Sequence, residues 1–196
     1  MRSRREGAEP LTKMRAAALY MILTGVMTMA SCGGNNVNRP DPVASVDLHR
    51  YRGKWYEIAK IPNRFQRKCA GNTTAEYTLR ADGTVLVVNS CLDHEGKRII
   101  AEGIGKVTDP LTNARLKVSF VKLFGVNFFW VDYWILGLDK DYHYAVVGVP
   151  NRKFGWILSR RPELSSAEWT AVEAILRSQG YHPEDFERTR HSSPNE

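Results

Sequence analysis

The stretch "NTTAEYTLRADGTVLVVNSC", residues 72–91, has the pattern of two β-strands joined by a tight turn. Its two halves, 72–80 and 84–91, are rich in β-branched and aromatic residues, which favour strands. Between them lies Ala-Asp-Gly, and Asp-Gly is a common hairpin connection because both residues tolerate the turn's backbone angles. A hairpin joins neighbouring strands in opposite directions, so this stretch predicts an antiparallel sheet.

Six more runs of the same character surround this hairpin. One precedes it and five follow it, namely "KWYEIAKI", "RIIAEGIGKV", "ARLKVSFV", "FFWVDYWILGL", "YHYAVVGV" and "FGWILSR". Turn signals separate the later runs, at Asp109-Pro110, Asp139-Lys140-Asp141 and Pro150-Asn151. Eight consecutive antiparallel strands close most simply into an up-and-down barrel, because closure removes the exposed edges. The predicted fold class is therefore all-β, an eight-stranded antiparallel barrel.

One helical pattern follows the strands, in "SSAEWTAVEAILRSQG". Ser165 or Ser166 can cap its start and Gly180 can end it. Trp169, Val172, Ile175 and Leu176 share one apolar face. A single amphipathic helix after a barrel has to pack on the outside of the barrel.

The first 31 residues have the features of an export signal. Arg15 is followed by an apolar run, Ala16–Met29, and then by the small residues Ala30 and Ser31. The run is shorter than the ~20 residues that a membrane-spanning helix needs. Residues 1–31 are therefore predicted to be a signal peptide.

Cys32 directly follows this signal. Met29-Ala30-Ser31-Cys32 resembles the lipobox of bacterial lipoproteins, which implies that Cys32 is lipidated and becomes the first residue of the mature chain. Several acyl chains on one residue anchor a protein stably. The alternative is an ordinary secretory signal with a chance cysteine. Gly33, rather than Asp, comes next, which favours the outer membrane of a Gram-negative bacterium, with the domain facing the periplasm.

These features divide the chain into four parts. After the signal peptide, residues 32–45 are predicted to be a lipidated N-terminus and a flexible Gly/Asn/Pro tether. Residues 46–190 form one domain, and 191–196 form a polar tail.

The three cysteines fit the same interpretation. If Cys32 is lipidated, Cys69 and Cys91 remain as a pair in an oxidising compartment, which predicts a disulfide. The sequence has no CxxC, and its five histidines are scattered without metal-ligand spacing, so no metal site is predicted. A nucleophilic Cys–His arrangement stays open as an alternative.

The charge of the chain disfavours nucleic acid as a partner. The formal net charge is +7, and it falls to +4 when residues 1–31, with five basic and two acidic side chains, are removed. The remaining Lys and Arg residues are dispersed and do not form one stripe.

Three short motifs resemble the lipocalin family, and within it the bacterial outer-membrane lipoproteins. They are the G-x-W of Gly53-Lys54-Trp55, the segment "LDKDYHYAVV" at 138–147 as a loose form of the T-D-Y block, and "WILSRRP" at 156–162 with Arg160. Their order, with a C-terminal helix, covers nearly all of 47–190. The resemblance implies a cup-shaped barrel that binds a lipophilic molecule, without enzymatic activity and without a cofactor.

In such a barrel, Trp55 on the first strand and Arg160 on the last would meet at the closed end. A guanidinium can lie on the indole face while its N–H groups bond nearby carbonyls. Gly53 fits a position where the entering chain passes too closely for a Cβ. We expect these three residues to form a structural plug.

The resemblance and strand alternation together predict the wall of the cup. The side chains expected to point inward and to bind the ligand are Ala75, Tyr77, Val87, Asn89, Leu116, Val118, Phe120, Tyr133 and Trp156. Tyr77 and Asn89 are the polar groups able to orient a head group. The alternative is a solid core, because side chains can fill an eight-stranded barrel.

The segment "KLFGVNFFWV", residues 122–131, is unusually apolar for a strand connection. It lies near the turn between the fifth and sixth strands, at the expected mouth of the cup. Leu123, Phe124, Phe128 and Phe129 either touch a membrane or partner there, or are strand residues of the wall.

The sequence thus predicts an outer-membrane lipoprotein that stores or transfers fatty acids or lysophospholipids. An enzyme acting on a bound lipophile and a purely structural envelope lipoprotein are the alternatives. The oligomeric state stays open.

Overall fold

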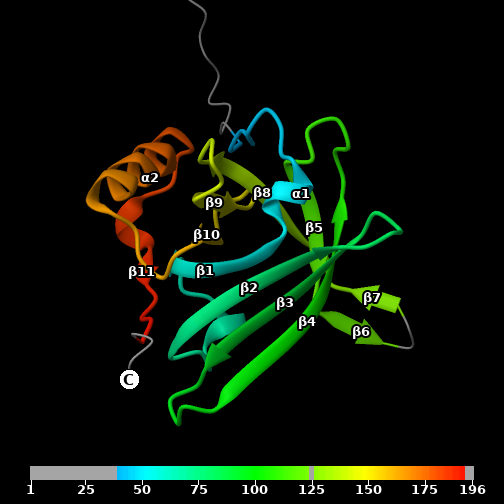
Figure 1. Cartoon of the computed structure of the whole chain (residues 1–196), viewed down its shortest axis with the longest axis horizontal. Coiled ribbons are helices and arrows are strands. Elements are labelled where there is room, and N and C mark those ends of the chain that lie inside the picture. Colours follow the sequence, from blue (N-terminus) through cyan, green and yellow to red (C-terminus); the bar gives the residue numbers. More distant parts are fainter. Residues whose placement is uncertain (1–38, 124–125, 193–196) are drawn as a thin grey trace, which may run out of the picture. The chain divides into compact units, whose positions relative to one another are not determined.

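The structure is a computed structural model that describes residues 39–123 and 126–192 (Figure 1). The predicted signal peptide, Cys32 and residues 193–196 lie outside the described residues, as do Phe124 and Gly125.

Antiparallel strands form one closed sheet. Its order is β10-β9-β8-β5-β4-β3-β2-β1-β11, and β10 also pairs with β1, which closes eight of the strands into a barrel. These eight are β1 (Gly53–Lys60), β2 (Gly71–Leu79), β3 (Val85–Leu92), β4 (Arg98–Val107), β5 (Arg115–Ser119), β8 (Val131–Leu138), β9 (Tyr144–Gly148) and β10 (Gly155–Ser159). The predicted eight-stranded antiparallel barrel is confirmed.

Two short additions were not predicted. β6 (Val121–Leu123) and β7 (Val126–Phe128) form a separate two-stranded hairpin between β5 and β8, which projects from the barrel in Figure 1. The run expected to be one strand from Phe128 onward therefore begins in the barrel only at Val131. The other addition is β11 (Glu187–Arg188), which extends the sheet beside β1.

Helix α2 (Ser166–Ser178) packs against the outside of the barrel, as predicted. Ser165 caps it, and Glu168 completes the capping box by bonding back to the Ser165 backbone. Val172 and Leu176 are buried against an outward-facing cluster that includes Ile58 and Ile157. Burial of this face fixes the helix on the sheet.

Three short helical segments lie in the connections. α1 (Leu48–Tyr51) leads into β1 and is capped by Asp47, η1 (Arg64–Gln66) lies between β1 and β2, and η2 (Pro183–Asp185) follows α2. No helix in these described stretches is long and apolar enough to cross a membrane.

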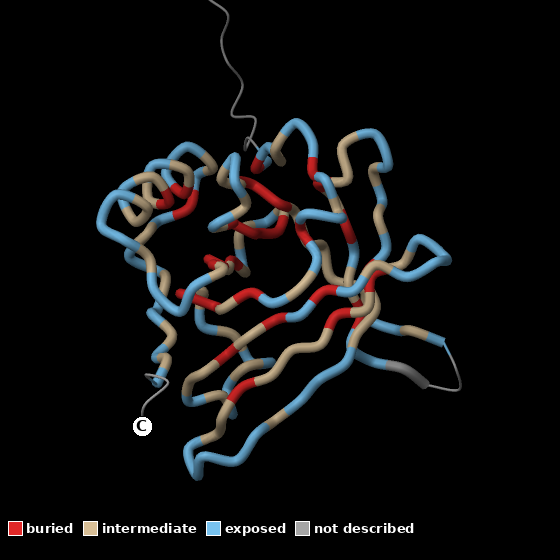
Figure 2. Tube along the Cα trace, viewed as in Figure 1, coloured by how far each residue is buried: buried red, intermediate tan, exposed pale blue. Residues whose placement is uncertain are grey.

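The barrel has separate inner and outer cores. The inner cluster includes Trp55, Val87, Ile135 and Leu158, whereas the outer one lies between the sheet and α2. Figure 2 shows the buried residues concentrated toward one end of the barrel, whereas the first half of β4, toward the other end, is mostly exposed.

Candidate functional site

The inner face of the barrel is the candidate site, and strand register assigns its residues. Residues paired across antiparallel strands share a face. The pairs Ala75–Asn89, Tyr77–Val87 and Leu116–Tyr133 therefore point to the same side, as do Gly105 and Val118, and Trp156 and Val147. Most of these residues pack in or against the inner cluster. The structure thus brings the predicted wall residues together, while their role in binding stays a prediction.

Burial along the inner face changes from one end of the barrel to the other. On β4, Gly105 is buried, Gly103 is half-buried and Ala101 is exposed, although all three share the inward face. The inner surface therefore closes at one end and opens to solvent at the other, which is the form of a cup.

Phe120 marks the rim of this cup. It follows β5 and is 40% exposed. A Cβ on Gly103 would lie 2.7 Å from Phe120 Cδ1, so the ring rests directly on the glycine. Gly103 therefore makes room for the aromatic side chain at the mouth.

Arg160 and Trp55 close the other end. The Arg160 guanidinium carbon lies 3.8 Å from the centre of the Trp55 ring. Arg160 Nη1 donates to the Lys54 carbonyl at 2.8 Å, and Nη2 donates to the carbonyls of Arg50, Tyr51 and Arg52. One side chain therefore ties the chain entering β1 to the end of β10, while the role of these residues as a structural plug stays a prediction.

Gly53 is required for a different reason from the expected one. Its φ is +91°, a conformation that side-chain-bearing residues rarely adopt. A Cβ there would lie 3.6 Å from Arg160 Nη1, which is an ordinary contact. Backbone conformation, rather than a close approach, explains this glycine.

Three tyrosines meet inside the barrel just above the plug, so Tyr77, expected to orient a head group, lies at the closed end and away from the mouth. The Tyr133 hydroxyl lies 2.8 Å from that of Tyr51 and 2.9 Å from that of Tyr77. Burial raises the pKa of Tyr51 and Tyr133 well above the usual value, and raises the pKa of Tyr77 to about 12. A cavity of about 20 Å³ lies beside them.

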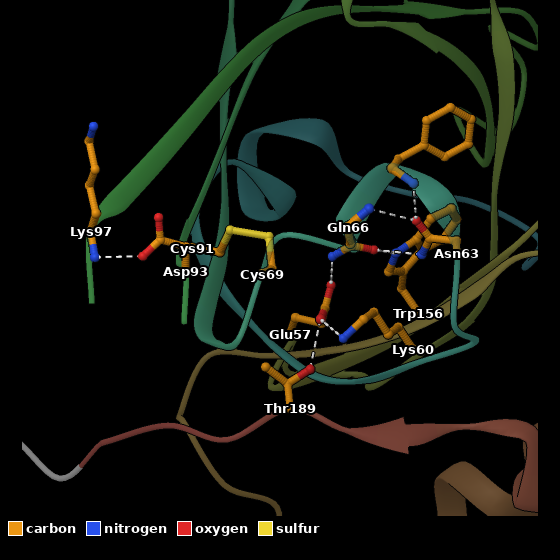
Figure 3. The surroundings of a disulfide bond; sticks show 11 residues. Glu57, Lys60, Asn63, Gln66, Cys69, Cys91, Asp93, Lys97, Trp156 and Thr189 are labelled. Atoms are coloured by element: carbon orange, nitrogen blue, oxygen red, sulfur yellow. Dashed lines mark hydrogen bonds and ion pairs between the residues drawn. A yellow bond between two sulfur atoms is a disulfide. The ribbon is translucent and has the colours of Figure 1, made fainter. Parts of the chain in front are cut away.

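A buried carboxylate lies on the β1 side of the inner face. Glu57 is 3% exposed. It accepts hydrogen bonds from Gln66 Nε2 at 2.5 Å and from Thr189 Oγ1 at 2.7 Å, and it pairs with Lys60 Nζ at 3.4 Å (Figure 3). A buried carboxylate needs such partners, because leaving one unpaired is costly.

Lys60 points inward because β1 contains an irregularity. Glu57 pairs with Leu158, but after the register shift Ala59 pairs with Ile157 and Lys60 with Trp156. The shift returns Lys60 to the face of Trp156, with its side chain only 14% exposed. An ammonium group is thereby held at the mouth side of the cup.

Gln66 connects the loop after β1 to the cup wall. Its side-chain oxygen accepts from Trp156 Nε1 at 3.0 Å and from Asn63 Nδ2 at 2.8 Å. Asn63 in turn caps η1 by accepting from the backbone N–H groups of Phe65 and Gln66. The same loop carries Cys69.

The predicted disulfide between Cys69 and Cys91 is present, with a Cα–Cα distance of 5.6 Å. Figure 3 shows it beside the Glu57–Gln66 network. It fastens the loop after η1 to the end of β3.

The C-terminal segment fills a gap between β1 and β2. These two strands pair only over Gly53–Tyr56, and beyond that point β1 pairs with β11. The backbone N–H of Thr189 donates to Ile58, and the carbonyl of Arg190 accepts from the backbone N–H of Asn72. The segment therefore covers the backbone groups that the splayed strands leave unpaired.

Sequence reasoning missed four polar residues of the inner face, namely Tyr51, Glu57, Lys60 and Gln66. Alternation from Trp55 would have found Glu57, because the two residues differ by two positions on one strand. The register shift hides Lys60, and Tyr51 and Gln66 lie in short helical segments without a strand period.

Metal-binding side chains do not gather in the described part of the chain. No group of three or more His, Cys, Asp or Glu side chains between residues 39 and 192, outside 124–125, is placed to hold a metal ion.

Comparison with known protein families gives one match over most of the chain. A family model described as a lipocalin-like domain matches residues 46–191. Temperature-induced lipocalin-1 of Arabidopsis thaliana is 37% identical over 153 residues, which are 76% of this chain and 82% of the plant protein. The outer membrane lipoprotein Blc of Escherichia coli is 34% identical over 175 residues, which are 88% of this chain and 96% of Blc. Mouse apolipoprotein D is 32% identical over 178 residues, and the match covers 85% of this chain and 90% of the mouse protein.

Solved structures agree on the fold. Insecticyanin from the tobacco hornworm superposes with a TM-score of 0.63 at 25% identity, over 79% of this chain and 86% of that protein. The cockroach allergen Per a 4 gives a TM-score of 0.59 at 20% identity, over 76% of this chain and 90% of the allergen.

Proposed function

This chain belongs to the lipocalin family, and from that premise we propose that it is an outer-membrane lipoprotein that binds one acyl chain inside its barrel. The ligand is a fatty acid or a lysophospholipid, which the protein stores or transfers in the cell envelope.

One observation carries the proposal, namely the apolar inner wall that passes from buried to exposed toward one end of the barrel. Such a wall favours an apolar chain inserted from the mouth. Burying about ten methylenes at roughly 0.8 kcal/mol each supplies on the order of 8 kcal/mol before ordering costs. Micromolar affinity, or somewhat tighter, follows when head-group contacts offset those costs.

Lys60 is suited to the head group. Fatty acids and lysophospholipids both carry an anionic oxygen in the head group, as a carboxylate or a phosphate, and an ammonium group is a good partner for it. Lys60 Nζ already pairs with Glu57, but at 3.4 Å and with the side chain partly exposed, so it can also face a ligand at the mouth. Asn89, on the same inner face, supplies a neutral polar group.

The lipid anchor on Cys32 is the second part of the proposal. The lipobox-like sequence before Cys32 supports it, and so does the similarity to a relative whose name is outer membrane lipoprotein Blc. We expect Cys32→Ser to remain uncleaved or to be released to the periplasm, and to lack the mass of the lipid. Outer-membrane fractionation of Cys32→Ser with an unchanged mass would contradict the anchor.

The binding proposal is tested by titrating a fluorescent fatty acid into residues 33–196. Trp156 lies on the inner wall, so its fluorescence is expected to change saturably as the cup fills. Val118→Trp is expected to occupy the cup and to abolish this signal, because Val118 lies beside the inner cavity. Thr78→Trp is the matched control, since Thr78 is exposed on the outer face of the sheet. Absence of a saturable signal, or an unchanged one in Val118→Trp, would contradict acyl-chain binding.

Two alternative functions are separated by extraction. A ligand holder should release an extractable lipid from the purified protein, whereas a purely structural envelope lipoprotein should not. Turnover of that lipid by the purified protein would instead favour an enzyme.

A further inference from the structure

The three tyrosine hydroxyls above the plug have one more donor than they can use among themselves. Tyr51, Tyr133 and Tyr77 form a chain with two O···O contacts, of 2.8 and 2.9 Å. Each contact uses one O–H, and a tyrosine hydroxyl has one proton to donate. Within the described structure these hydroxyls hydrogen-bond only to one another. Whichever way the chain is oriented, one O–H is left without an acceptor.

This count of three O–H donors holds because all three tyrosines are protonated at neutral pH. Burial raises the pKa of each of them above its usual value, and the pKa of Tyr77 reaches about 12. Tyr51 and Tyr77 are only 4% and 7% exposed and Tyr133 is half-buried, so the chain of hydroxyls has little access to bulk water. A buried donor without an acceptor is costly, so this position favours an oxygen atom.

The structure also provides room for that atom. The cavity of about 20 Å³ is lined by all three tyrosines, and a site of roughly 10–15 Å³ is enough for one water-sized group. The rest of its lining is mostly apolar, including Val87, Gly105 and Val118. Whichever tyrosine holds the spare O–H, its hydroxyl belongs to a residue that lines this cavity near the plug.

We propose that the cup selects acyl chains that carry a hydroxyl or keto oxygen near the end that lies deepest in the barrel. The inference rests on the proposed function, in which the chain enters from the mouth and its head group stays there. An oxygen at the inner end accepts the spare O–H bond. A methyl group in the same place displaces any water and leaves the donor unpaired, which disfavours the unsubstituted chain.

The test compares ω-hydroxy fatty acids with the plain fatty acids of equal length, titrated into residues 33–196. Only one chain length places the oxygen beside the tyrosines, so the affinity ratio is expected to peak at one length. At that length we expect the ω-hydroxy acid to bind about tenfold more tightly or better, since a site with a buried donor discriminates strongly against an analogue that lacks the acceptor.

The decisive variant replaces all three tyrosines, because a single Tyr→Phe change still leaves one unpaired donor. In Tyr51→Phe/Tyr77→Phe/Tyr133→Phe the shape is kept and every hydroxyl is removed, a change that is often nearly neutral for stability. This variant is expected to lose the preference for the ω-hydroxy acid, measured as the ratio of its affinity to that of the plain acid of equal length. Tyr144→Phe is the control, because Tyr144 packs with the outer cluster.

A second readout reports the hydrogen bond itself. The carbonyl stretch of a bound fatty acid with a keto group next to its far end should shift to lower frequency in the wild type and not in the triple variant. Equal affinity for plain and ω-hydroxy acids at every length, or a preference that survives in the triple variant, would overturn the inference and leave acyl binding intact. Failure of both series to bind would overturn the proposed function and the inference together.

Discussion

At the scale of single residues, Arg160 combines more interactions than any other side chain of the plug. Its guanidinium covers the Trp55 ring and its two terminal nitrogens reach four backbone carbonyls. Only a planar guanidinium with several N–H groups can make these contacts at once, so lysine cannot replace Arg160. We therefore expect the plug, which lies apart from the open mouth, to act structurally.

The first prediction concerns stability at the plug. Trp55→Ala should lower the free energy of unfolding by about 3–5 kcal/mol, the usual cost of removing a buried tryptophan. Arg160→Ala and Arg160→Lys should each cost about 1–3 kcal/mol, because backbone carbonyls around the plug lose a charged donor. Denaturant unfolding of residues 33–196 measures these changes.

Arg177→Ala is the control for Arg160. Arg177 is exposed and pairs with Glu173 at 3.9 Å on the surface of α2, so its loss should cost less than about 1 kcal/mol. Near-identical stability of Arg160→Ala and Arg177→Ala would show that the plug does not depend on the guanidinium.

The second prediction concerns alkaline pH. The pKa of Tyr77 is raised to about 12 in the folded protein, mainly by burial, against about 10 in an unfolded chain. The stabilisation is fully present below pH 10 and is lost as the pH rises toward 12, because the unfolded state then releases protons that the folded state keeps. The free energy of unfolding should therefore fall over this interval.

The triple Phe variant should show a shallower decline over the same interval, since it lacks the three buried phenols. Near-ultraviolet absorbance of tyrosinate, followed during a pH titration, should likewise show fewer late-titrating groups. Parallel profiles of stability against pH for the wild type and the triple variant would show that these three tyrosines do not cause the decline.

The sequence predicted the apolar part of the inner face better than its polar part. Strand alternation placed Ala75, Val87 and Val118 correctly on the inner face because regular pairing preserves the two-residue period. Lys60 could not be placed in this way, since the shift after Glu57 changes which residues point inward. Inward positions close to a break in pairing are therefore the ones that a sequence pattern leaves undetermined.

At the scale of secondary-structure elements, the loop between β1 and β2 is held from two sides. The disulfide ties Cys69 to β3, and Gln66 ties η1 to Glu57 and Trp156. The third prediction is that removing the disulfide by Cys69→Ser/Cys91→Ser costs about 3 kcal/mol, from the loop-closure entropy of the unfolded chain.

The same change should increase amide hydrogen exchange most strongly at residues 63–71, because η1 loses one of its two attachments. Unfolding of the oxidised wild type and of the double variant gives the stability, and exchange detected by mass spectrometry gives the location. A uniform rise in exchange over the whole barrel would contradict a local role for the disulfide.

The C-terminal segment is an element that the sequence did not reveal. β11 has only two residues and no apolar alternation, so its position depends on the backbone groups that β1 and β2 leave unpaired. Similarly, the sequence could not distinguish the β6–β7 hairpin from the sixth barrel strand, β8, because the apolar residues of the hairpin run on into those of β8. The barrel strands themselves were predictable because each is bounded by turn residues.

The fourth prediction uses truncation of this segment. Ending the chain at Phe186 removes Thr189 from Glu57 and Arg190 from Asn72, and it should lower both stability and retention of ligand. Ending it at Ser192 keeps every contact described here and is the control. Equal melting temperatures for the two truncations would show that the segment does not support β1.

At the scale of the whole barrel, the open end carries an exposed apolar hairpin. Val126, Phe128 and Phe129 are 57%, 43% and 80% exposed, and Phe129 adopts a φ of +57°, which is uncommon for a bulky residue. Ser119 Oγ donates to the carbonyl of Phe128 at 2.5 Å and lies 3.3 Å from the carbonyl of Val121, so the base of the hairpin is fixed to β5. Exposed apolar groups of this size are typical of surfaces that contact a membrane or a partner.

Positive charge lies next to the hairpin. Lys106 and Lys117 are paired across β4 and β5, are exposed, and face outward, with Asp132 of β8 beside Lys117 on the same face. Lys106 Nζ also lies 5.1 Å from the ring of Trp130, directly after the hairpin. Exposed apolar residues beside lysines fit an anionic lipid surface, at the end of the barrel through which a ligand would pass.

The last prediction is that the hairpin docks the mouth on lipid, so that a chain can move from the membrane into the cup. Phe128→Ser/Phe129→Asn should lower partitioning of residues 33–196 onto phosphatidylglycerol-containing vesicles by roughly tenfold, because burial of two aromatic side chains is lost. Asn is chosen at position 129 because it tolerates a positive φ. Affinity for a fatty acid free in solution should stay unchanged, whereas transfer of that acid from vesicles should slow.

Leu111→Ser is the control, since Leu111 is 92% exposed in the β4–β5 connection at the opposite end of the barrel. Slower transfer in Leu111→Ser, with normal transfer in the hairpin variant, would place the membrane contact at the closed end and contradict loading through the mouth.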